Sequence, residues 1–188
     1  MKFAQNRVVI LSGPSGVGKD TVLDRWMAEN PLVERVVAAT TRSPREGEID
    51  GDAYHFLSLD EFESRASNGD FLEFKNVHGN WYATPISSVN AILEKGGVAV
   101  LKIDVQGAEE VVRTHPEIVT IFLLPPSIEE LERRIRSRAT DSEEAIEQRL
   151  LNAKEEIERS EFYLHHIVNQ SIEGVVDQLE QIVGAVEV

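Results

Sequence analysis

Short, continuous apolar runs recur along this chain, and glycine, proline or charged residues separate them. Runs of this kind, when they are rich in β-branched residues, are typical of strands buried on both faces of a sheet. We expect strands at residues 7–11, 33–39, 54–57, 71–77, 80–84, 98–103, 119–124 and 166–169. The runs 71–77 and 80–84 flank His78-Gly79 and are predicted to form a hairpin-like pair.

Between these runs, apolar residues recur at the spacing of one helix face. One helix is expected after the glycine-rich stretch 13–21 and another at 87–95, where Gly96-Gly97 favours a left-handed cap. Ser58 and Glu61 fit a capping box at the start of a further helix. The residues that predict the remaining helices are Ile128, Leu131 and Ile135, then Ile146, Leu150, Ala153 and Ile157, and finally Ile172, Val175, Val176, Leu179, Ile182 and Val183.

The alternation of strands and helices predicts an α/β fold with a mostly parallel sheet and crossover helices on its faces. A polar segment from Thr40 to about Pro85 interrupts the alternation, and we interpret it as an inserted subdomain. A second insertion is expected between Pro125 and about Arg149. We therefore expect a single domain over residues 1–188, with a core at about 1–39, 86–124 and 150–188.

Composition narrows the classes of function. The 188 residues are 41% hydrophobic and 28% charged, which is typical of one globular domain. The chain has no cysteine, so disulfides, thiolate nucleophiles and iron–sulfur clusters are excluded. The net charge of −14 opposes binding to a nucleic-acid polymer. Because no apolar run is long enough to cross a membrane and no secretory signal begins the chain, we expect a soluble cytoplasmic protein.

The strongest local signal is Gly13-Pro-Ser-Gly-Val-Gly18-Lys19, between a predicted strand and a predicted helix. A glycine-rich turn in this position lets backbone N–H groups curve around phosphate oxygens, and the helix N-terminus adds partial positive charge. Lys19 can then reach the terminal phosphates. We interpret the segment as a phosphate-binding loop (P-loop); the alternative is a glycine-rich turn that only caps a helix.

One residue departs from the usual P-loop pattern. Asp20 stands where a serine or threonine normally provides a hydroxyl ligand to magnesium, and Thr21 follows one residue later. A carboxylate also suits a hard cation, so Asp20 is a candidate magnesium ligand. The alternative is that Asp20 only interacts favourably with the helix dipole.

A second polar cluster begins at Thr41. Arg42 and Arg45 lie three residues apart on a proline-containing loop, and Glu48 and Tyr54 follow them. Two guanidinium groups so close together suit the oxygens of a phosphate monoester. The alternative is a solvated charged loop. A P-loop in the same chain favours a second phosphate site.

The chain also carries an ordered series of motifs: GPSGVGK, TTRSPREGEIDG, YHF, FLE, GNWYAT, IDVQGA and PPS. This series resembles the guanylate kinases, which belong to the nucleoside monophosphate kinase group of P-loop proteins. The resemblance extends from about Arg7 to Val183. It implies that the core is a P-loop sheet, that the insert at about 40–85 is a GMP-binding subdomain, and that the segment at about 125–149 is a helical lid.

The resemblance also implies roles for individual residues. Those matched to ATP binding are Gly13, Pro14, Ser15, Gly16, Val17, Gly18, Lys19, Asp20, Thr21 and Asn169. Those matched to GMP binding are Arg42, Arg45, Glu48, Tyr54, Glu73, Tyr82, Thr84 and Asp104, with Glu73 reading the guanine base. Those matched to catalysis are Lys19, Arg42, Arg134, Arg138 and Arg149.

The predicted lid helix supports its assignment independently. If Ile128, Leu131 and Ile135 face inward, Arg134 and Arg138 lie one turn apart on the flank of that apolar stripe. Such a pair can reach transferring phosphates. The alternative is ordinary ion pairing with acidic residues on a solvated helix.

Some residues differ from the family pattern. Ala38, Ala83 and Ala139 stand where a serine or glycine is usual, and Lys102 replaces an acidic residue. If the strand at 98–103 lies beside the strand that precedes the P-loop, Lys102 can reach Asp20. We therefore hypothesise that the two residues form a pair that preserves local neutrality and alters how magnesium is held. The alternative is two unrelated substitutions.

The resemblance implies an enzyme that transfers the γ-phosphoryl group of ATP to GMP or dGMP with Mg²⁺. We expect ATP and GMP or dGMP as partners, no nucleic-acid polymer, no membrane, and a monomer or homodimer. The alternative is a non-catalytic guanylate-kinase-like binding module, which would typically lack an intact P-loop and lid arginines.

Overall fold

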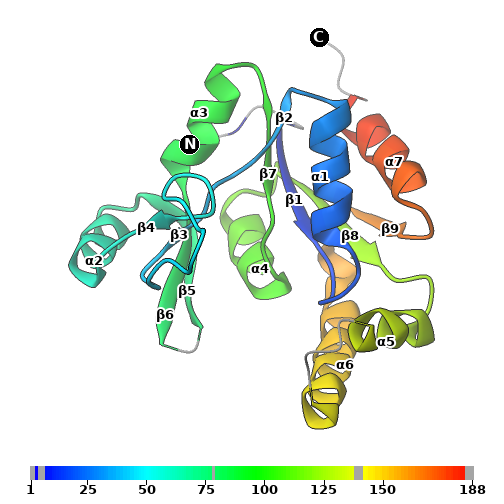
Figure 1. Ribbon diagram of the computed structural model, residues 1–188. Helices are drawn as coiled ribbons and strands as arrows, with labels where there is room; N and C mark the ends of the chain where they lie inside the picture. Colours follow the sequence, from blue (N-terminus) through cyan, green and yellow to red (C-terminus); the bar gives the residue numbers. More distant parts are fainter. Residues whose placement is uncertain (1–2, 4–6, 78, 138–141, 185–188) are drawn as a thin grey trace.

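The computed structural model describes residues 3, 7–77, 79–137 and 142–184, and its core is a parallel sheet (Figure 1). The sheet has five strands in the order β2-β7-β1-β8-β9. These strands are β1 (Val8–Ser12), β2 (Val33–Arg35), β7 (Val98–Leu101), β8 (Val119–Leu124) and β9 (His165–Val168). The α/β class expected from the sequence is confirmed, with a parallel sheet at its centre.

The central strand β1 is apolar at every position except its last because both of its faces are covered. Val9 and Leu11 pack into one buried cluster, which includes residues of α1 (Lys19–Glu29) and α7 (Ile172–Gly184). Val8 and Ile10 point to the opposite face and pack with residues of α3 (Ile86–Glu94) and α4 (Val105–Thr114). Successive side chains of a strand alternate between its faces, so a strand covered on both sides must be apolar at every position.

A second, smaller sheet lies beside the core (Figure 1). Its four strands follow the order β4-β3-β6-β5, and they are β3 (Ala39–Thr40), β4 (His55–Phe56), β5 (Phe71–Val77) and β6 (Asn80–Pro85). Strands β5 and β6 pair antiparallel, which confirms the predicted hairpin-like pair. Helix α2 (Leu59–Ser67) packs Phe62 against this sheet, and the Ser58 hydroxyl accepts from the Glu61 N–H as expected for its N-cap.

The single strand predicted at 33–39 is wrong. The apolar run is divided between β2 in the core sheet and β3 in the smaller sheet. Hydrophobicity alone marks residues as buried, but it does not say against which sheet they are buried. The helix α4 was not predicted; it begins after Asp104, whose carboxylate accepts from the Gly107 N–H as an N-cap.

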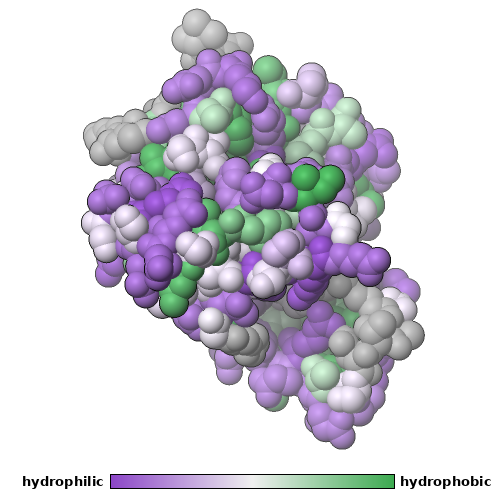
Figure 2. All heavy atoms as spheres, turned by 60° about the vertical axis from the view of Figure 1, so that its left-hand side comes forward, coloured by the Kyte–Doolittle hydropathy of each residue, from purple (hydrophilic) through white to green (hydrophobic). Residues whose placement is uncertain are grey.

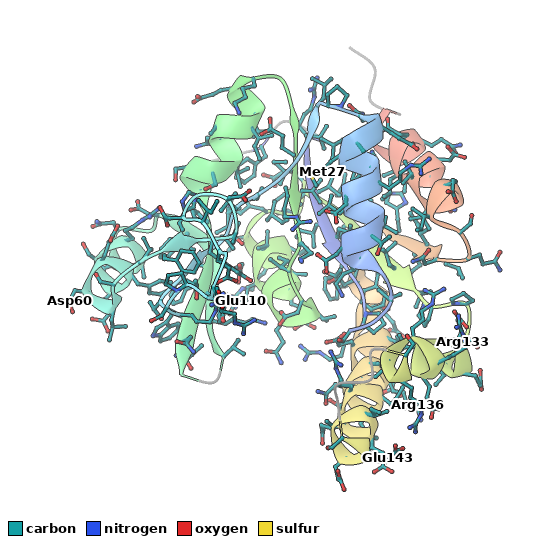
Figure 3. The ribbon with its side chains drawn as sticks, in the orientation of Figure 1. Met27, Asp60, Glu110, Arg133, Arg136 and Glu143 are labelled. Atoms are coloured by element: carbon teal, nitrogen blue, oxygen red, sulfur yellow. The ribbon has the colours of Figure 1, made fainter. Side chains whose placement is uncertain are left out.

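Two helices, α5 (Ile128–Arg136) and α6 (Glu143–Glu158), project from the core below α1 and β8 in the view of Figure 1. Leu131 and Ile135 on α5 pack with Ile146 and Ala153 on α6, as the helical spacing predicted. Arg136 and Glu143 form an ion pair across the junction of the two helices, at 2.5 Å (Figure 3). A short 3₁₀ helix, Arg159–Phe162, leads from α6 into β9.

The face that carries the small sheet is largely hydrophilic, with apolar residues in scattered groups (Figure 2). None of the helices in the described part of the chain is long and apolar enough to cross a membrane.

Candidate active site

The loop between β1 and α1 curves tightly enough to require glycine. Gly16 has φ +89° and Gly18 has φ +102°, both in the left-handed region that side chains disfavour. A Cβ on Gly16 would lie 2.9 Å from Cγ1 of Ile135, and a Cβ on Gly18 would lie 2.8 Å from Nδ2 of Asn169. The loop is therefore closely covered by the projecting helix α5 and by the residue after β9.

Lys19 is the first residue of α1, and its side chain folds back over the loop. Its ammonium donates to the carbonyl oxygens of Gly13 and Pro14, the latter at 3.2 Å. Burial lowers the pKa of Lys19 to about 8, against the opposing effect of the nearby Glu156 and Asp20 carboxylates. The loop thus contains a poorly solvated cation whose bonds to neutral carbonyls a phosphate can replace.

Three side chains predicted to bind ATP or close the lid meet at this loop. Arg134 donates to the carbonyl of Val17 at 3.1 Å, and Asn169 donates to the same oxygen at 2.8 Å. Arg149 on α6 donates to the Ser15 hydroxyl at 3.3 Å. Arg138 lies outside the described residues. Arg134 also pairs with Glu130 at 2.8 Å, so the ion pair of the alternative interpretation coexists with the loop contact.

The projecting helix presents its other arginines elsewhere. Arg133 pairs with Glu130, and Arg136 pairs with Glu132 and with Glu143 of α6. Figure 3 labels Arg133, Arg136 and Glu143 on these two helices. The division between Arg134 and its neighbours follows from helical spacing, because adjacent residues of a helix point in different directions.

A cavity of about 480 Å³ opens beside the loop. It is lined by Gly16, Gly18, Thr21, Arg134, Ser137, Asn169, Gln170, Ser171 and Ile172. Loop backbone lies at one end of this cavity and the segment after β9 at the other. We call it the donor cavity.

A second cavity of about 330 Å³ lies between the two sheets. We call it the acceptor cavity. It is lined by Ala38, Tyr54, Glu73, Lys75, Val77, Tyr82, Ala83, Thr84, Lys102, Ile103 and Asp104. Glu73 is 7% exposed, and its carboxylate accepts from the Thr84 hydroxyl at 2.6 Å. Burial raises the pKa of the Glu73 carboxyl, against the effect of the Thr84 hydrogen bond.

The predicted phosphate side of the acceptor cavity is held together by Glu48. Its carboxylate accepts from the Arg42 guanidinium at 2.9 and 3.0 Å and from the Arg45 N–H at 2.7 Å. The Arg42 guanidinium lies 5.4 Å from the Tyr54 ring centroid, and the Tyr54 and Tyr82 rings meet edge to face at 5.9 Å. The Arg45 residue is exposed on its loop. Glu48 therefore orients one arginine and the backbone of the other.

Two lysines form ion pairs at the acceptor cavity. Lys75 on β5 pairs with Asp104, so the small sheet is linked to the core at the start of α4. Lys102 pairs with Asp20, the residue after the P-loop lysine. The pairing of Asp20 with Lys102 that we hypothesised from the sequence is present in the structure.

The setting of Asp20 limits what it can do for a metal ion. Its carboxylate binds the Lys102 ammonium, and Nη2 of Arg35 lies 3.9 Å away. Two cations beside one carboxylate oppose a divalent ion. No group of three or more His, Asp or Glu side chains in the described residues forms a metal site. Protein residues alone therefore do not build a magnesium site around Asp20.

Most of the residues predicted from motifs lie around the P-loop and the two cavities, and the Asp20–Lys102 pair links the start of α1 to the lining of the acceptor cavity. The residue that sequence reasoning missed is Lys75. Its position two residues after Glu73 on one strand places both side chains on the same face, and this alternation could have indicated it. No local pattern indicates its partner, since Lys75 and Asp104 are distant in the chain.

Comparisons with known proteins agree with this arrangement. The family model described as guanylate kinase matches residues 5–186. A guanylate kinase of Trichormus variabilis is 42% identical over 94% of this chain and 89% of its own length. One from Carboxydothermus hydrogenoformans is 43% identical over 95% and 87% of the two chains.

Solved structures agree as well. The crystal structure of guanylate kinase from Anaplasma phagocytophilum matches with a TM-score of 0.72 and 34% identity, over 98% of this chain and 88% of that one. An SH3-kinase fragment of tight junction protein 3 matches with a TM-score of 0.54 at 14% identity, over 98% of this chain and 59% of the fragment. The second likeness shows a shared fold only.

The lowered pKa of Lys19 predicts a pH-dependent affinity for phosphate ligands. A bound phosphate favours the charged ammonium and raises its pKa, so binding takes up a proton above pH 8. We expect affinity for ADP, as a probe of the loop, to be nearly constant below pH 7 and to fall by up to about tenfold per pH unit above pH 8. Calorimetry in buffers of different ionisation enthalpy measures both effects.

The matched control is Lys19→Arg, because arginine stays charged throughout this range. Its affinity is expected to be weaker at neutral pH but flat with pH. A wild-type affinity that does not change between pH 7 and 9.5 would contradict the prediction.

The close approach of α5 to Gly16 makes a second prediction. Gly16→Ala places a Cβ both in a left-handed conformation and against Ile135, so we expect lower stability by about 1–2 kcal/mol or more and weaker ADP binding. Gly184→Ala is the control, because nothing lies within 4 Å of a Cβ there. Equal melting temperatures and ADP affinities for both variants would contradict the prediction.

Proposed function

The chain belongs to the guanylate kinase family, and we propose that it transfers the γ-phosphoryl group of ATP to GMP, giving GDP and ADP. The observation that carries this proposal is the pair of cavities, one beside a P-loop and the other holding a buried carboxylate. Phosphoryl transfer needs little covalent chemistry from the protein, because the acceptor phosphate oxygen attacks directly. The protein supplies position and charge.

The base would be read in the acceptor cavity by Glu73. Guanine presents two donors, at N1 and the 2-amino group, and a carboxylate accepts both. Adenine has no 2-amino group and has an acceptor at N1, so it would leave the carboxylate unpaired. The Thr84 hydroxyl fixes one oxygen of Glu73, which supports a defined orientation for the base. Glu73 and Thr84 are assigned to the base and not to the 2′-hydroxyl of the ribose, so dGMP is expected to be a substrate too.

The GMP phosphate would bind near Arg42, Tyr54 and Tyr82. The Glu48 carboxylate orients Arg42 and also accepts from the Arg45 N–H, which holds the backbone of Arg45 beside Arg42. Asp104 lines the acceptor cavity and forms an ion pair with Lys75.

ATP would occupy the donor cavity. Backbone N–H groups of residues 13–19 and the start of α1 would surround its phosphates, with Lys19 at the terminal ones. Asn169 and Thr21 line the cavity that would hold the nucleoside, and Arg134, Arg149 and Arg138 would close over the phosphates. Contact of α5 with the loop supports exclusion of water, which suppresses ATP hydrolysis.

We propose that Mg²⁺ enters as the ATP complex. Ions of this type retain several waters and bind mainly through substrate phosphates, with one or two carboxylates at most. Bound to ATP, the ion neutralises phosphate charge. The occupied Asp20 carboxylate does not fit as its principal protein ligand, so we assign no step to that pairing.

A coupled assay of ADP formation with GMP, dGMP, AMP, CMP and UMP tests the proposal. We expect turnover with GMP and dGMP and little with the others. Lys19→Met is the control for the P-loop and should abolish turnover. Turnover of AMP without GMP would overturn the substrate. No turnover at all, with retained peptide or ligand binding at the acceptor cavity, would favour the binding module.

The arginine loop makes a prediction about selectivity between substrates. Arg42→Ala and Arg45→Ala should each weaken GMP binding by about ten- to hundredfold, because each removes a charge-assisted phosphate contact. ATP affinity should change far less, since both residues lie in the insert. Calorimetry with each nucleotide measures this. Arg113→Ala, an exposed change on α4, is the control. Unchanged GMP affinity in a folded Arg42→Ala protein would contradict the assignment.

The buried carboxylate makes a prediction about base choice. Glu73→Gln should reduce GMP turnover and narrow the preference for GMP over AMP, because an amide presents a donor toward a guanine edge that also donates. The ratio of kcat/KM for the two nucleotides measures it. Glu63→Gln, on the exposed face of α2, is the matched control. A Glu73→Gln protein with full GMP preference would show that the base is read elsewhere.

A further inference from the structure

Lys102 lies between the acceptor cavity and the start of α1, directly after the P-loop. It lies just after β7, and its side chain lines the acceptor cavity. Its ammonium binds the carboxylate of Asp20, in the first turn of α1 directly after the P-loop lysine. One cation therefore stands between the place proposed for the GMP phosphate and the place proposed for the ATP phosphates.

The sheet fixes this position. Strands β1 and β7 run parallel, with Ile10 opposite Leu101, so both strands end at the same edge. Ser12 donates to the carbonyl of Ile103 at 2.7 Å, which ties the two strand ends together. Ligands of open parallel sheets bind beyond this edge. The backbone that bears Lys102 therefore lies at the same ligand-binding edge of the sheet as the P-loop.

The Asp20–Lys102 pair is too exposed to contribute much to the stability of the fold. The Asp20 side chain is 63% exposed and the Lys102 side chain is 32% exposed. Ion pairs with this exposure contribute little to stability. A lysine ammonium has three donors, so after binding Asp20 it retains donors for phosphate oxygens. What distinguishes the pair is its location.

Charges around the pair also favour a role with anions. Burial acts to raise the pKa of Asp20, but the Lys102 hydrogen bond and the charges of Lys102, Arg35 and Lys19 outweigh it and lower that pKa. The carboxylate is therefore a persistent anion that keeps Lys102 in place. The charge of Lys102 in turn contributes to the lowered pKa of Lys19, which indicates that the two ammonium groups share one local field.

We propose that Lys102 is a phosphate-binding residue shared by the donor and acceptor sites, and that Asp20 is the positioning residue that holds its ammonium there. The proposal rests on the proposed function, whose two phosphate groups it places on either side of Lys102. When both nucleotides are bound, Lys102 exchanges part of its contact with Asp20 for oxygens of the acceptor or transferring phosphate. It lowers the repulsion between the two polyanions as they approach.

The test uses the full chain and the variants Lys102→Met, Asp20→Asn, the double variant and Lys102→Arg. The control is Lys95→Met, because Lys95 is the exposed C-cap residue of α3, pairs with Glu34 at 3.5 Å and lines neither the donor nor the acceptor cavity. Affinity for GMP is measured by calorimetry without ATP or metal. The values of kcat, KM for GMP and KM for ATP are measured separately, together with the melting temperature and the magnesium dependence of the rate.

For Lys102→Met, we expect GMP affinity to fall by about tenfold and kcat to fall by about ten- to hundredfold, with a melting temperature like that of Lys95→Met. Lys102→Arg should recover most of kcat. Asp20→Asn should lower kcat less, and the double variant should be no worse than Lys102→Met, because Asp20 acts only through Lys102.

Three outcomes would overturn the proposal. The first is a Lys102→Met protein with the GMP affinity and kcat of the Lys95→Met control. The second is strictly additive losses in the double variant. The third is an Asp20→Asn protein that needs more magnesium whether or not Lys102 is present, which would make Asp20 a metal ligand.

Failure of the proposed function is distinguishable. A wild-type protein that phosphorylates no nucleotide counts against that function, and the GMP calorimetry of Lys102→Met still decides the role of Lys102. An active wild type with an unchanged Lys102→Met variant counts against this inference alone.

Discussion

Parallel pairing of β1 with β7 and β8 places the carboxyl ends of three strands at one edge of the central sheet. The P-loop leaves β1 there, Lys102 and Asp104 follow β7, and α5 follows β8 after a short turn. Because unpaired backbone amides and charged side chains are costly to bury in the core, they collect beyond this edge. Phosphate chemistry is possible in this acidic chain because the strand ends bring its few cations to one place.

Those cations are held by carboxylates. Arg42 binds Glu48, Arg134 binds Glu130, Lys75 binds Asp104 and Lys102 binds Asp20. Each pair fixes a long side chain that would otherwise lose conformational entropy when a phosphate binds. Each pair also limits the net positive charge of the site. A phosphate then competes with a carboxylate for a cation that is already oriented, which favours doubly charged ligands over weaker anions.

Much of the fold could be predicted from the sequence because burial on two faces requires continuous apolar runs in β1, β7 and β8. The P-loop and the apolar stripe of α5 can also be predicted from the sequence, since both depend on local residue spacing. The run 33–39 was read as one strand because its residues are buried against two sheets in succession. Helix α4 is not predicted because glycine, which disfavours helices, stands in its first turn at Gly107. The structure gives a tertiary reason for this glycine, since Oε2 of Glu73 lies 3.1 Å from the position of a Cβ on Gly107. Lys75–Asp104 depends on tertiary approach, which no local pattern encodes.

The Asp20–Lys102 pair could be predicted only in part, because it depends both on local motifs and on the tertiary approach of two strands. Neither residue is informative alone: an aspartate in a first helical turn suits the dipole, and a lysine after a strand is an ordinary surface residue. Together they differ from the family pattern with opposite charges, since Asp20 adds a negative charge and Lys102 adds a positive one. The adjacent, parallel placement of β1 and β7 predicts that the two side chains meet. Contact between them follows from topology as much as from chemistry, because a one-residue shift of β7 relative to β1 would place Lys102 on the other face. The alternation of side chains that buries the core thus also decides which charges can reach a phosphate.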